Sequence, residues 1–239
     1  MSVAVLVHGF GQTRQCWGQL PSALDANNFS VRSIDAPGHG DNSSLALNLV
    51  ETGDWLADVG GPATYIGYSM GARMCLHTAL LRPDVVERLV LISGTGGIDD
   101  PTERTARVAA DNDLADRIEL VGTAKFVDEW LTLPMFAHLP VSAQMREERL
   151  RNGSAGLATS LRLAGTGTQE PMWSALRRLQ MPVLVIAGAL DKKFCDLAQR
   201  IAVCIGANAT VSIIEDSGHT VHLEQPAAFE SHLSAWLRC

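Results

Sequence analysis

The chain has 239 residues, of which 46% are hydrophobic and 19% are charged, and its formal net charge is −7. This length and apolar content suit one large α/β domain, or one domain with an insertion. The negative charge, without any block of Lys and Arg, argues against nucleic acid as a partner because phosphate binding requires clustered cations.

The first part of the chain alternates between apolar runs and amphipathic segments. The run 2–7 is apolar and β-branched, which predicts a strand buried on both faces, as in a parallel sheet. Strands are predicted at 2–7, 29–34, 63–66 and 88–93, and helices at 15–24, 44–59 and 72–81. Helical segments of this length can cross over between parallel strands.

Residues 99–178 break this pattern because they contain no strand-like run. Charged helical segments are predicted at 102–115, 123–131, 143–150 and 156–163. An all-helical insertion at the carboxyl edge of a parallel sheet would cover any site located there. We therefore predict an α/β core of residues 1–98 and 179–239, with residues 99–178 forming a helical cap.

The α/β alternation returns after the insertion. Strands are predicted at 181–187 and 210–214, and helices at 194–203 and 226–237. The complete pattern predicts a mostly parallel sheet of about six strands with helices on both faces.

The sequence Gly67-Tyr68-Ser69-Met70-Gly71 lies between a predicted strand and a predicted helix. Such a turn can hold a serine in a strained conformation with its hydroxyl exposed, and the glycines avoid collisions in so sharp a bend. The helix N-terminus also favours an anion at this position. Alone, the pattern also occurs as a glycine-rich turn with an idle serine. The strand before it and the helix after it favour a nucleophile elbow.

Two further polar residues follow predicted strands, Asp191 after 181–187 and His219 after 210–214. Because the carboxyl ends of parallel strands share one edge, we expect Ser69, Asp191 and His219 to meet there. His219 can accept the serine proton near neutral pH, and Asp191 would orient the imidazole. Taken singly, Asp191 could be a helix cap and His219 a structural loop residue. Their joint order and placement predict a catalytic triad.

An oxyanion hole requires two N–H donors. We expect the backbone amides of Met70, at the start of the elbow helix, and of Phe10, in the turn after the first strand. His8 and His39 are expected to be structural and to bond loop backbone. No metal site and no cofactor are predicted, since no ligand spacing such as H-E-x-x-H is present.

The cysteines favour a reducing compartment. They stand at positions 16, 75, 195, 204 and 239, an odd number without C-x-x-C spacing, which argues against a disulfide framework. The apolar run 3–7 is too short for a signal-peptide core, and no run approaches the length of a membrane span. We predict a cytoplasmic protein that is a monomer or a homodimer.

Several motifs together resemble the α/β-hydrolase superfamily. They are the elbow, His8-Gly9-Phe10, Asp35-x-Pro37-Gly38-His39-Gly40, and the loops at Asp191 and Gly218-His219. The elbow with its following arginine, Gly67-Tyr68-Ser69-Met70-Gly71-x-Arg73, and several cap segments are similar to the 2-succinyl-6-hydroxy-2,4-cyclohexadiene-1-carboxylate synthase family of menaquinone biosynthesis. These segments are Glu103-Arg104-x-x-Arg107-x-x-x-Asp111, Phe126-x-x-x-Trp130-x-x-x-Pro134-x-Phe136, Arg151-x-x-x-x-Gly156-Leu157-Ala158, Ser160-Leu161-Arg162-x-x-Gly165-Thr166-Gly167-x-Gln169 and Asp191-x-Lys193-Phe194.

The resemblance implies a lyase with a small anionic polycarboxylate substrate and no cofactor. That family eliminates pyruvate from a compound carrying three carboxylates and a ketone. By similarity, the substrate-binding positions are Tyr68, Arg73, Arg107, Trp130 and Arg151. The alignment at Arg107 leaves Arg104 as an alternative. Without the resemblance, arginines in a charged helical region are most simply solvated partners of Asp and Glu.

Two other functions are compatible with the triad residues. Ser69 could be the nucleophile of a carboxylesterase or a thioesterase, or the chain could be a non-catalytic scaffold that only binds a ligand. An intact triad argues against the scaffold. Cationic side chains facing Ser69 would favour the lyase, and an apolar pocket would favour the esterase.

Overall fold

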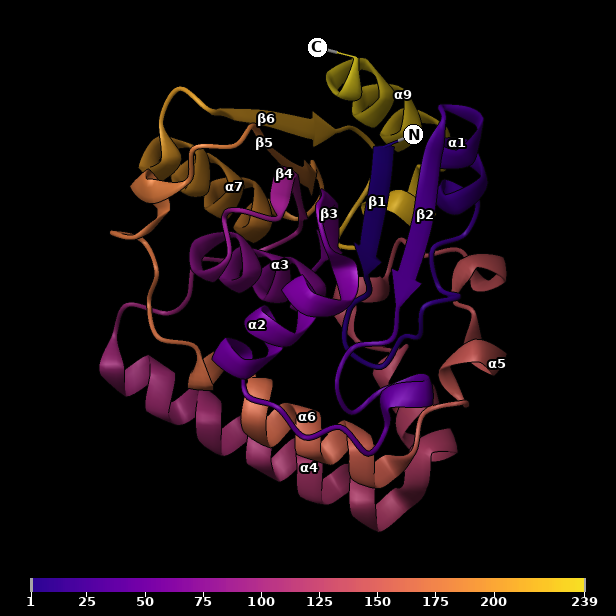
Figure 1. The fold of residues 1–239 in the computed structure, drawn as a ribbon. Coiled ribbons are helices and arrows are strands. Elements are labelled where there is room, and N and C mark those ends of the chain that lie inside the picture. The colour runs from indigo at the N-terminus through magenta and orange to yellow at the C-terminus, as the bar shows by residue number, and fades with distance from the viewer. Residues whose placement is uncertain (1, 239) are drawn as a thin grey trace.

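Six parallel strands form a single sheet in the computed structural model, which describes residues 2–238. The strands are β1 (Ser2–Val7), β2 (Phe29–Ile34), β3 (Ala63–Tyr68), β4 (Val86–Ile92), β5 (Val183–Gly188) and β6 (Ala209–Ile214). Their order in the sheet is β2-β1-β3-β4-β5-β6 (Figure 1). Strands β3 and β5 are buried along their whole length, which explains their continuous small and apolar sequences. The predicted six-stranded parallel sheet is confirmed.

Helices cover both faces of the sheet, as predicted. The nine α-helices of the described residues are α1 (Leu20–Ala26), α2 (Leu49–Gly60), α3 (Met70–Leu81), α4 (Pro101–Trp130), α5 (Arg146–Arg149), α6 (Ser154–Ala164), α7 (Lys192–Ile205), α8 (Val221–Glu224) and α9 (Pro226–Leu237). Because successive strand residues point to opposite faces, Tyr65 packs in the core formed with α2, α3 and α7, while Ile66 packs against α1 and α9. Short 3-10 turns occur at Gly40–Asn42, Pro134–Phe136, Val141–Ala143, Thr166–Thr168 and Leu176–Arg178.

Helices α1 and α2 begin about five residues later than predicted, and α5 begins at Arg146 instead of residue 143. Residues 15–19 form turns, and α1 starts at Leu20, with Pro21 in its first turn. Helix α2 starts at Leu49 instead of near residue 44 because Asn48 caps it. The Asn48 side chain accepts from the amides of Val50 and Glu51, and the Glu51 carboxylate accepts from the Asn48 amide. This capping box determines where the helix begins.

Between β4 and β5 the described chain forms helices and turns but no strand. Helices α4 and α6 run side by side below the sheet in Figure 1. The two helices predicted at 102–115 and 123–131 are present as the two parts of α4 (Pro101–Trp130), which meet at a kink at Gly122, where φ is 78° and ψ is 165°. Apolar side chains such as Ile118, Phe126 and Leu157 join α4 to α6. We interpret residues 99–178 as the cap over the core.

Gly67 and Gly71 make the turn between β3 and α3 possible. A Cβ on Gly71 would collide with the carbonyl oxygen of Val7, and a Cβ on Gly67 would collide with the carbonyl oxygen of Gly71. The start of α3 therefore lies closer to β1 than any other residue type would permit.

Two further features of the described chain are its free thiols and its lack of a membrane-spanning helix. Cys16, Cys75, Cys195 and Cys204 are free thiols, and Cys239 lies outside the described residues. Across residues 2–238, none of the helices has both the length and the apolar content needed to cross a bilayer.

We predict that Gly71→Ala lowers the free energy of unfolding by about 3 kcal/mol or more, because a methyl group would have to displace backbone atoms of β1. Gly153→Ala is the matched control, since no atom lies within 4 Å of its added Cβ and its φ is −86°. The control should change stability by about 1 kcal/mol or less. Urea unfolding of both variants measures the difference, and equal stabilities would contradict the steric argument.

Candidate active site

Ser69 is the single residue between β3 and α3, and its backbone conformation is strained. Its φ is 52° and its ψ is −104°, which is rare for a residue with a side chain. Its backbone amide donates to the carbonyl oxygen of Ile92 at 2.8 Å, which holds the turn against β4. The neighbouring helix α3 begins at Met70, so Ser69 lies at the N-terminus of a helix, where negative charge is favoured.

The structure brings Ser69, His219 and Asp191 together at the carboxyl edge of the sheet. His219 Nε2 lies 3.0 Å from Ser69 Oγ, and His219 Nδ1 lies 2.9 Å from Asp191 Oδ2. A carboxylate at Nδ1 favours the tautomer that carries its proton there, leaving Nε2 free to accept the serine proton. These distances permit proton transfer from the hydroxyl to the imidazole.

Asp191 contacts His219 and also caps a helix, and its sequence position suggested both of these placements. One carboxylate oxygen faces His219, and the other, Oδ1, accepts from the amide of Phe194 at 3.3 Å and so caps α7. The Phe194 ring packs edge-on against the imidazole of His219 at 4.4 Å between centroids. The cap of α7 thereby fixes the carboxylate that orients the histidine.

The amides expected for the oxyanion hole, those of Phe10 and Met70, belong to residues that line one cavity with Ser69. Met70 is the first residue of α3, so its N–H has no acceptor within the helix. In the turn after β1, the amide of Gly9 donates to Gln12 Oε1 at 3.0 Å, and that of Gly11 donates to His39 Nε2 at 3.1 Å. These bonds engage the amides on either side of Phe10 and fix the conformation of the turn.

A cavity of about 490 Å³ lies above Ser69, between the core and the cap. Its cationic lining residues are Arg73 from α3, Arg107 from α4 and Lys193 from α7. A second lobe of about 400 Å³ shares these three residues and Ser69 with the first. Three cationic side chains therefore lie near the serine in a chain whose net charge is negative, while Asp111 and Asp191 also line the first lobe and Asp99, Asp100 and Glu103 the second.

Arg73 presents a buried positive charge to this cavity. Its side chain is only 6% exposed and donates to the carbonyl oxygens of Ala164 and Gly165 and to Gln169 Oε1. Among the described residues, no carboxylate lies within 4.0 Å of its guanidinium. Burial, followed by the charge of Arg107, lowers the pKa of Arg73 to about 10, so it stays charged at neutral pH. A buried cation without a carboxylate partner is suited to binding an anionic ligand.

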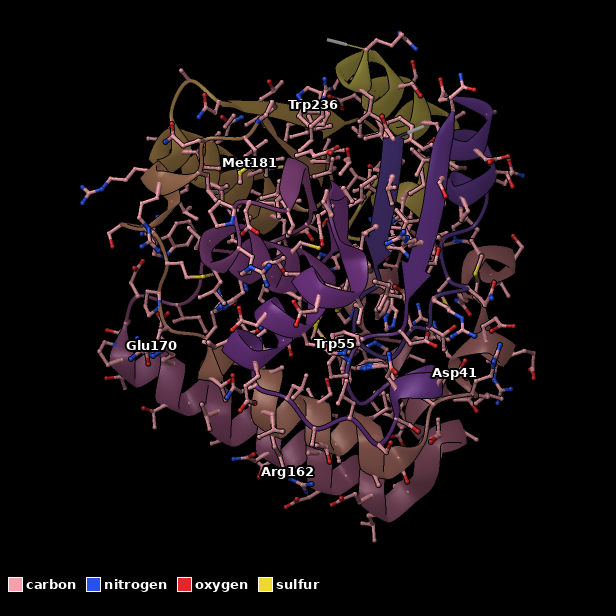
Figure 2. All side chains as sticks on the ribbon, viewed as in Figure 1. Asp41, Trp55, Arg162, Glu170, Met181 and Trp236 are labelled. Atoms are coloured by element: carbon pink, nitrogen blue, oxygen red, sulfur yellow. The ribbon has the colours of Figure 1, made fainter. Side chains whose placement is uncertain are left out.

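Of the two neighbouring cap arginines, Arg107 faces the cavity and Arg104 does not. Arg107 lines both lobes, and its Nε donates to Asp111 Oδ1 at 2.8 Å. Arg104 instead lies 3.6 Å from Glu170 Oε2, an exposed carboxylate labelled near the start of α4 in Figure 2. The two residues are three positions apart and share one side of α4, so their different partners, Asp111 and Glu170, distinguish them and not opposite helix faces.

The structure places Arg151 away from the cavity, so our expectation for this residue requires correction. Its side chain is 48% exposed and pairs with Glu148 and, at 3.9 Å, with Asp41, which lies at the surface near α5 (Figure 2). Arg149, two residues earlier, is 1% exposed and lines a small cavity together with Ser69. The turns at 149–152 direct these two arginines to opposite sides of the chain, which a short sequence motif does not reveal.

Arg149 belongs to a small cavity of about 20 Å³ that also touches Ser69. Its Nε donates to the carbonyl oxygen of Gln144 and its Nη1 to that of Gly11, but Nη2 has no protein acceptor. Gln12 Nε2 and Trp130 Nε1, which line the same cavity, are also buried donors without protein acceptors. Buried donors are normally paired, so three of them around one cavity suit an oxygen atom of a ligand.

Trp130 lies in the wall of the main cavity, whereas Tyr68 does not line it. Trp130 packs edge-on against Phe10 at 5.5 Å between ring centroids. Tyr68 is buried, and its hydroxyl is 3.0 Å from Thr220 Oγ1. Its ring centroid is 5.5 Å from that of His219, so Tyr68 supports the histidine from below. It reaches only the small cavity.

The lining residues outside our predicted set include Gln12, His138, Arg149 and Lys193, whose side chains are polar or charged. Lys193 was visible in the motif after Asp191 and could have been selected from it. Nothing in the sequence distinguishes Gln12 or His138 from other loop residues. Within residues 2–238, no three His, Cys, Asp or Glu side chains converge in a way that could hold a metal ion.

His8 and His39 hold loop backbone, as expected, and are not part of the reactive group. His8 Nε2 accepts from the amide of Ala36 at 3.0 Å, and His39 Nε2 accepts from that of Gly11. Burial lowers the pKa of His8 to about 4 and, together with the nearby His8, that of His39 to about 3. Both are therefore neutral at physiological pH.

Comparison with known proteins identifies related chains. The model of the alpha/beta hydrolase family matches residues 4–232. A Bacillus subtilis protein, provisionally named a 2-succinyl-6-hydroxy-2,4-cyclohexadiene-1-carboxylate synthase, is 34% identical, with 98% of this chain and 89% of the relative covered. A synthase of the same name from Serratia proteamaculans is 30% identical over 86% of this chain and 82% of its own. The structure of MenH from S. aureus superposes with a TM-score of 0.91 at 30% identity, covering 99% and 93% of the two chains.

The buried histidines predict that stability falls in mild acid. Burial also lowers the pKa of His77 to about 4 and that of His222 to about 3, well below the value near 6.5 in an unfolded chain. Below that value the unfolded state binds more protons than the native state, so stability present at neutral pH is lost as pH falls. Each such histidine contributes up to about 1.4 kcal/mol per pH unit.

Urea unfolding from about pH 7 to about pH 5 measures this slope. His77→Leu removes one neutral buried imidazole and should give a shallower dependence than the wild type. Parallel pH dependences of the two proteins would show that His77 is not held neutral by the fold.

Proposed function

The chain belongs to the alpha/beta hydrolase family, and within that family we propose that it is a carbon–oxygen lyase of menaquinone biosynthesis. Its substrate is 2-succinyl-5-enolpyruvyl-6-hydroxy-3-cyclohexene-1-carboxylate, from which it eliminates pyruvate. The ring product is 2-succinyl-6-hydroxy-2,4-cyclohexadiene-1-carboxylate, the compound in the names of the Bacillus and Serratia relatives. The free thiols of the described residues support our placing it in the cytoplasm.

The observation that carries this proposal is the charge around Ser69. Arg73, Arg107 and Lys193 line the main cavity, and Arg149 lies beside the serine in the small one. Arg73 and Arg149 are buried, and no carboxylate among the described residues lies within 4.0 Å of either. Substrate carboxylates would neutralise Arg73 and Arg149, whereas an uncharged ester would leave both of these arginines unpaired.

Ser69 serves as the base. His219 accepts the Ser69 hydroxyl proton, while Asp191 stabilises the imidazolium that forms. The serine oxygen then removes the proton from ring carbon 2, the electron pair of that C–H bond forms the C2=C3 double bond, and the pair of the original C3=C4 double bond moves to C4=C5. The C–O bond to the enolpyruvyl group breaks, and the released enolate takes up a proton and becomes pyruvate. The ring loses one proton and the product gains one. The reaction therefore consumes no water and forms no acyl-enzyme.

The backbone amides of Met70 and Phe10 stabilise the negative charge that develops on the substrate ketone as its neighbouring proton departs. Arg73 and Arg107 bind substrate carboxylates, and Arg149 takes the position that the resemblance suggested for Arg151. Trp130 packs on the ring of the substrate. Tyr68 acts from below, by supporting His219.

The second candidate is a carboxylesterase or thioesterase with Ser69 as the nucleophile. The strained elbow and the contact of 3.0 Å between Ser69 and His219 are as suitable for acyl transfer as for proton abstraction. Activity on esters without pyruvate release would favour this candidate.

We predict that the purified protein releases pyruvate from the enolpyruvyl cyclohexene substrate and that Ser69→Ala lowers kcat by about a thousand-fold or more, because the base is lost. Coupled oxidation of NADH by lactate dehydrogenase measures the pyruvate. Ser30→Ala, on an exposed position of β2, is the control and should behave as the wild type. A panel of p-nitrophenyl esters measured alongside tests the second candidate, and wild-type turnover by Ser69→Ala would contradict both.

The arginines give a separate prediction. Arg73→Met and Arg149→Met should each lower kcat/KM by about 30-fold or more, corresponding to roughly 2–5 kcal/mol for a buried charge that meets a substrate carboxylate. Arg151→Met should stay within about two-fold of wild type because its exposed ion pairs contribute little. Steady-state kinetics of the three variants decide between Arg149 and Arg151. A loss confined to Arg151→Met would restore the assignment that the sequence motif suggested.

A further inference from the structure

Glu224, the last residue of α8, lies against the loop that carries His219. Its Oε2 accepts from the amide of Gly218 at 2.5 Å, and its Oε1 accepts from the amide of Thr220 at 2.8 Å. These two amides belong to the residues immediately before and after His219. The two oxygens of one carboxylate therefore hold the backbone on both sides of the histidine.

The carboxylate of Glu224 is buried and has no cationic partner. The residue is 8% exposed, and among the described residues no side-chain nitrogen of Lys, Arg or His lies within 4.0 Å of its oxygens. Burying an unpaired carboxylate costs several kcal/mol unless hydrogen bonds compensate. Here the compensation comes from the two amides, and an uncharged glutamine could offer only one oxygen to them.

Two further contacts immobilise the same loop. Ser93, at the end of β4, donates its hydroxyl proton to the carbonyl oxygen of His219 at 2.8 Å. The hydroxyl of Tyr68 is 3.0 Å from Thr220 Oγ1. The backbone around His219 is thus bound through amide, carbonyl and side-chain groups, although it belongs to neither a strand nor a helix.

We propose that Glu224 is a positioning residue for the reaction at Ser69. By fixing the amides that flank His219, it determines where the imidazole lies and therefore the distance between His219 Nε2 and Ser69 Oγ. Proton transfer depends steeply on this distance, so a small shift of the loop slows the reaction without removing any group that contacts the substrate. The proposal rests on the proposed role of His219 as the proton acceptor, but not on the identity of the substrate.

Glu224→Gln tests the proposal because it retains the size of the side chain but removes one acceptor. We expect kcat for pyruvate release to fall by about 10- to 100-fold while KM changes by less than about three-fold, since no substrate contact is lost. Labelling of Ser69 by a fluorophosphonate should slow by a similar factor, because it reports activation of the serine independently of the substrate. The matched control is Glu51→Gln, which removes a carboxylate that accepts from the Asn48 amide, far from the triad in the chain.

Glu224→Asp provides a second variant if Glu224→Gln does not fold. It keeps the charge and both acceptors but withdraws them by one methylene, so kcat and labelling should again fall while KM is kept. A folded variant at Glu224 with kcat and labelling within about two-fold of Glu51→Gln would overturn the proposal. A wild-type protein that is labelled but releases no pyruvate would instead overturn the proposed lyase activity and leave the role of Glu224 testable by labelling.

Discussion

The close approach of α3 to β1 at Gly71 is the constraint on which the site depends. With only a hydrogen at this Cα, the first turn of the helix can lie against the carbonyl oxygen of Val7. This contact brings the free amide of Met70 near the turn after β1, which contains Phe10. It also requires Ser69 to adopt its strained backbone conformation above the sheet edge. Stability and reactivity are therefore set by the same steric requirement.

The buried arginines distinguish this site from other active sites built on the same turn between a strand and a helix. The guanidinium groups of Arg73 and Arg149 are held by backbone carbonyls and amide oxygens instead of carboxylates. Carbonyl dipoles orient these groups without neutralising them, so the positive charge remains available to a ligand. Because the fold and the triad are compatible with many reactions, these arginines carry more information about the substrate than Ser69 does.

Much of this architecture could be predicted because it depends on local pattern. The strands are short apolar runs, and Ser69, Asp191 and His219 stand where those runs end. What could not be predicted depends on the path of the chain in the cap. Arg149 and Arg151 differ by two residues, and only the three-dimensional turn after α5 shows that one is buried and the other exposed. The positions of Tyr68 and Gln12 likewise depend on packing between segments distant in sequence.

The kink in α4 has a consequence for the shape of the ligand cavity. The segment before Gly122 carries Arg107, and the segment after it carries Trp130, so one helix supplies both a polar wall and an aromatic wall. The bend is braced on both sides, because Arg117 and Glu129 form an ion pair at 2.6 Å across it, and Ile118 and Phe126 pack against α6. The angle at Gly122, held by these contacts, therefore sets how far apart the arginine and the tryptophan stand along the cavity.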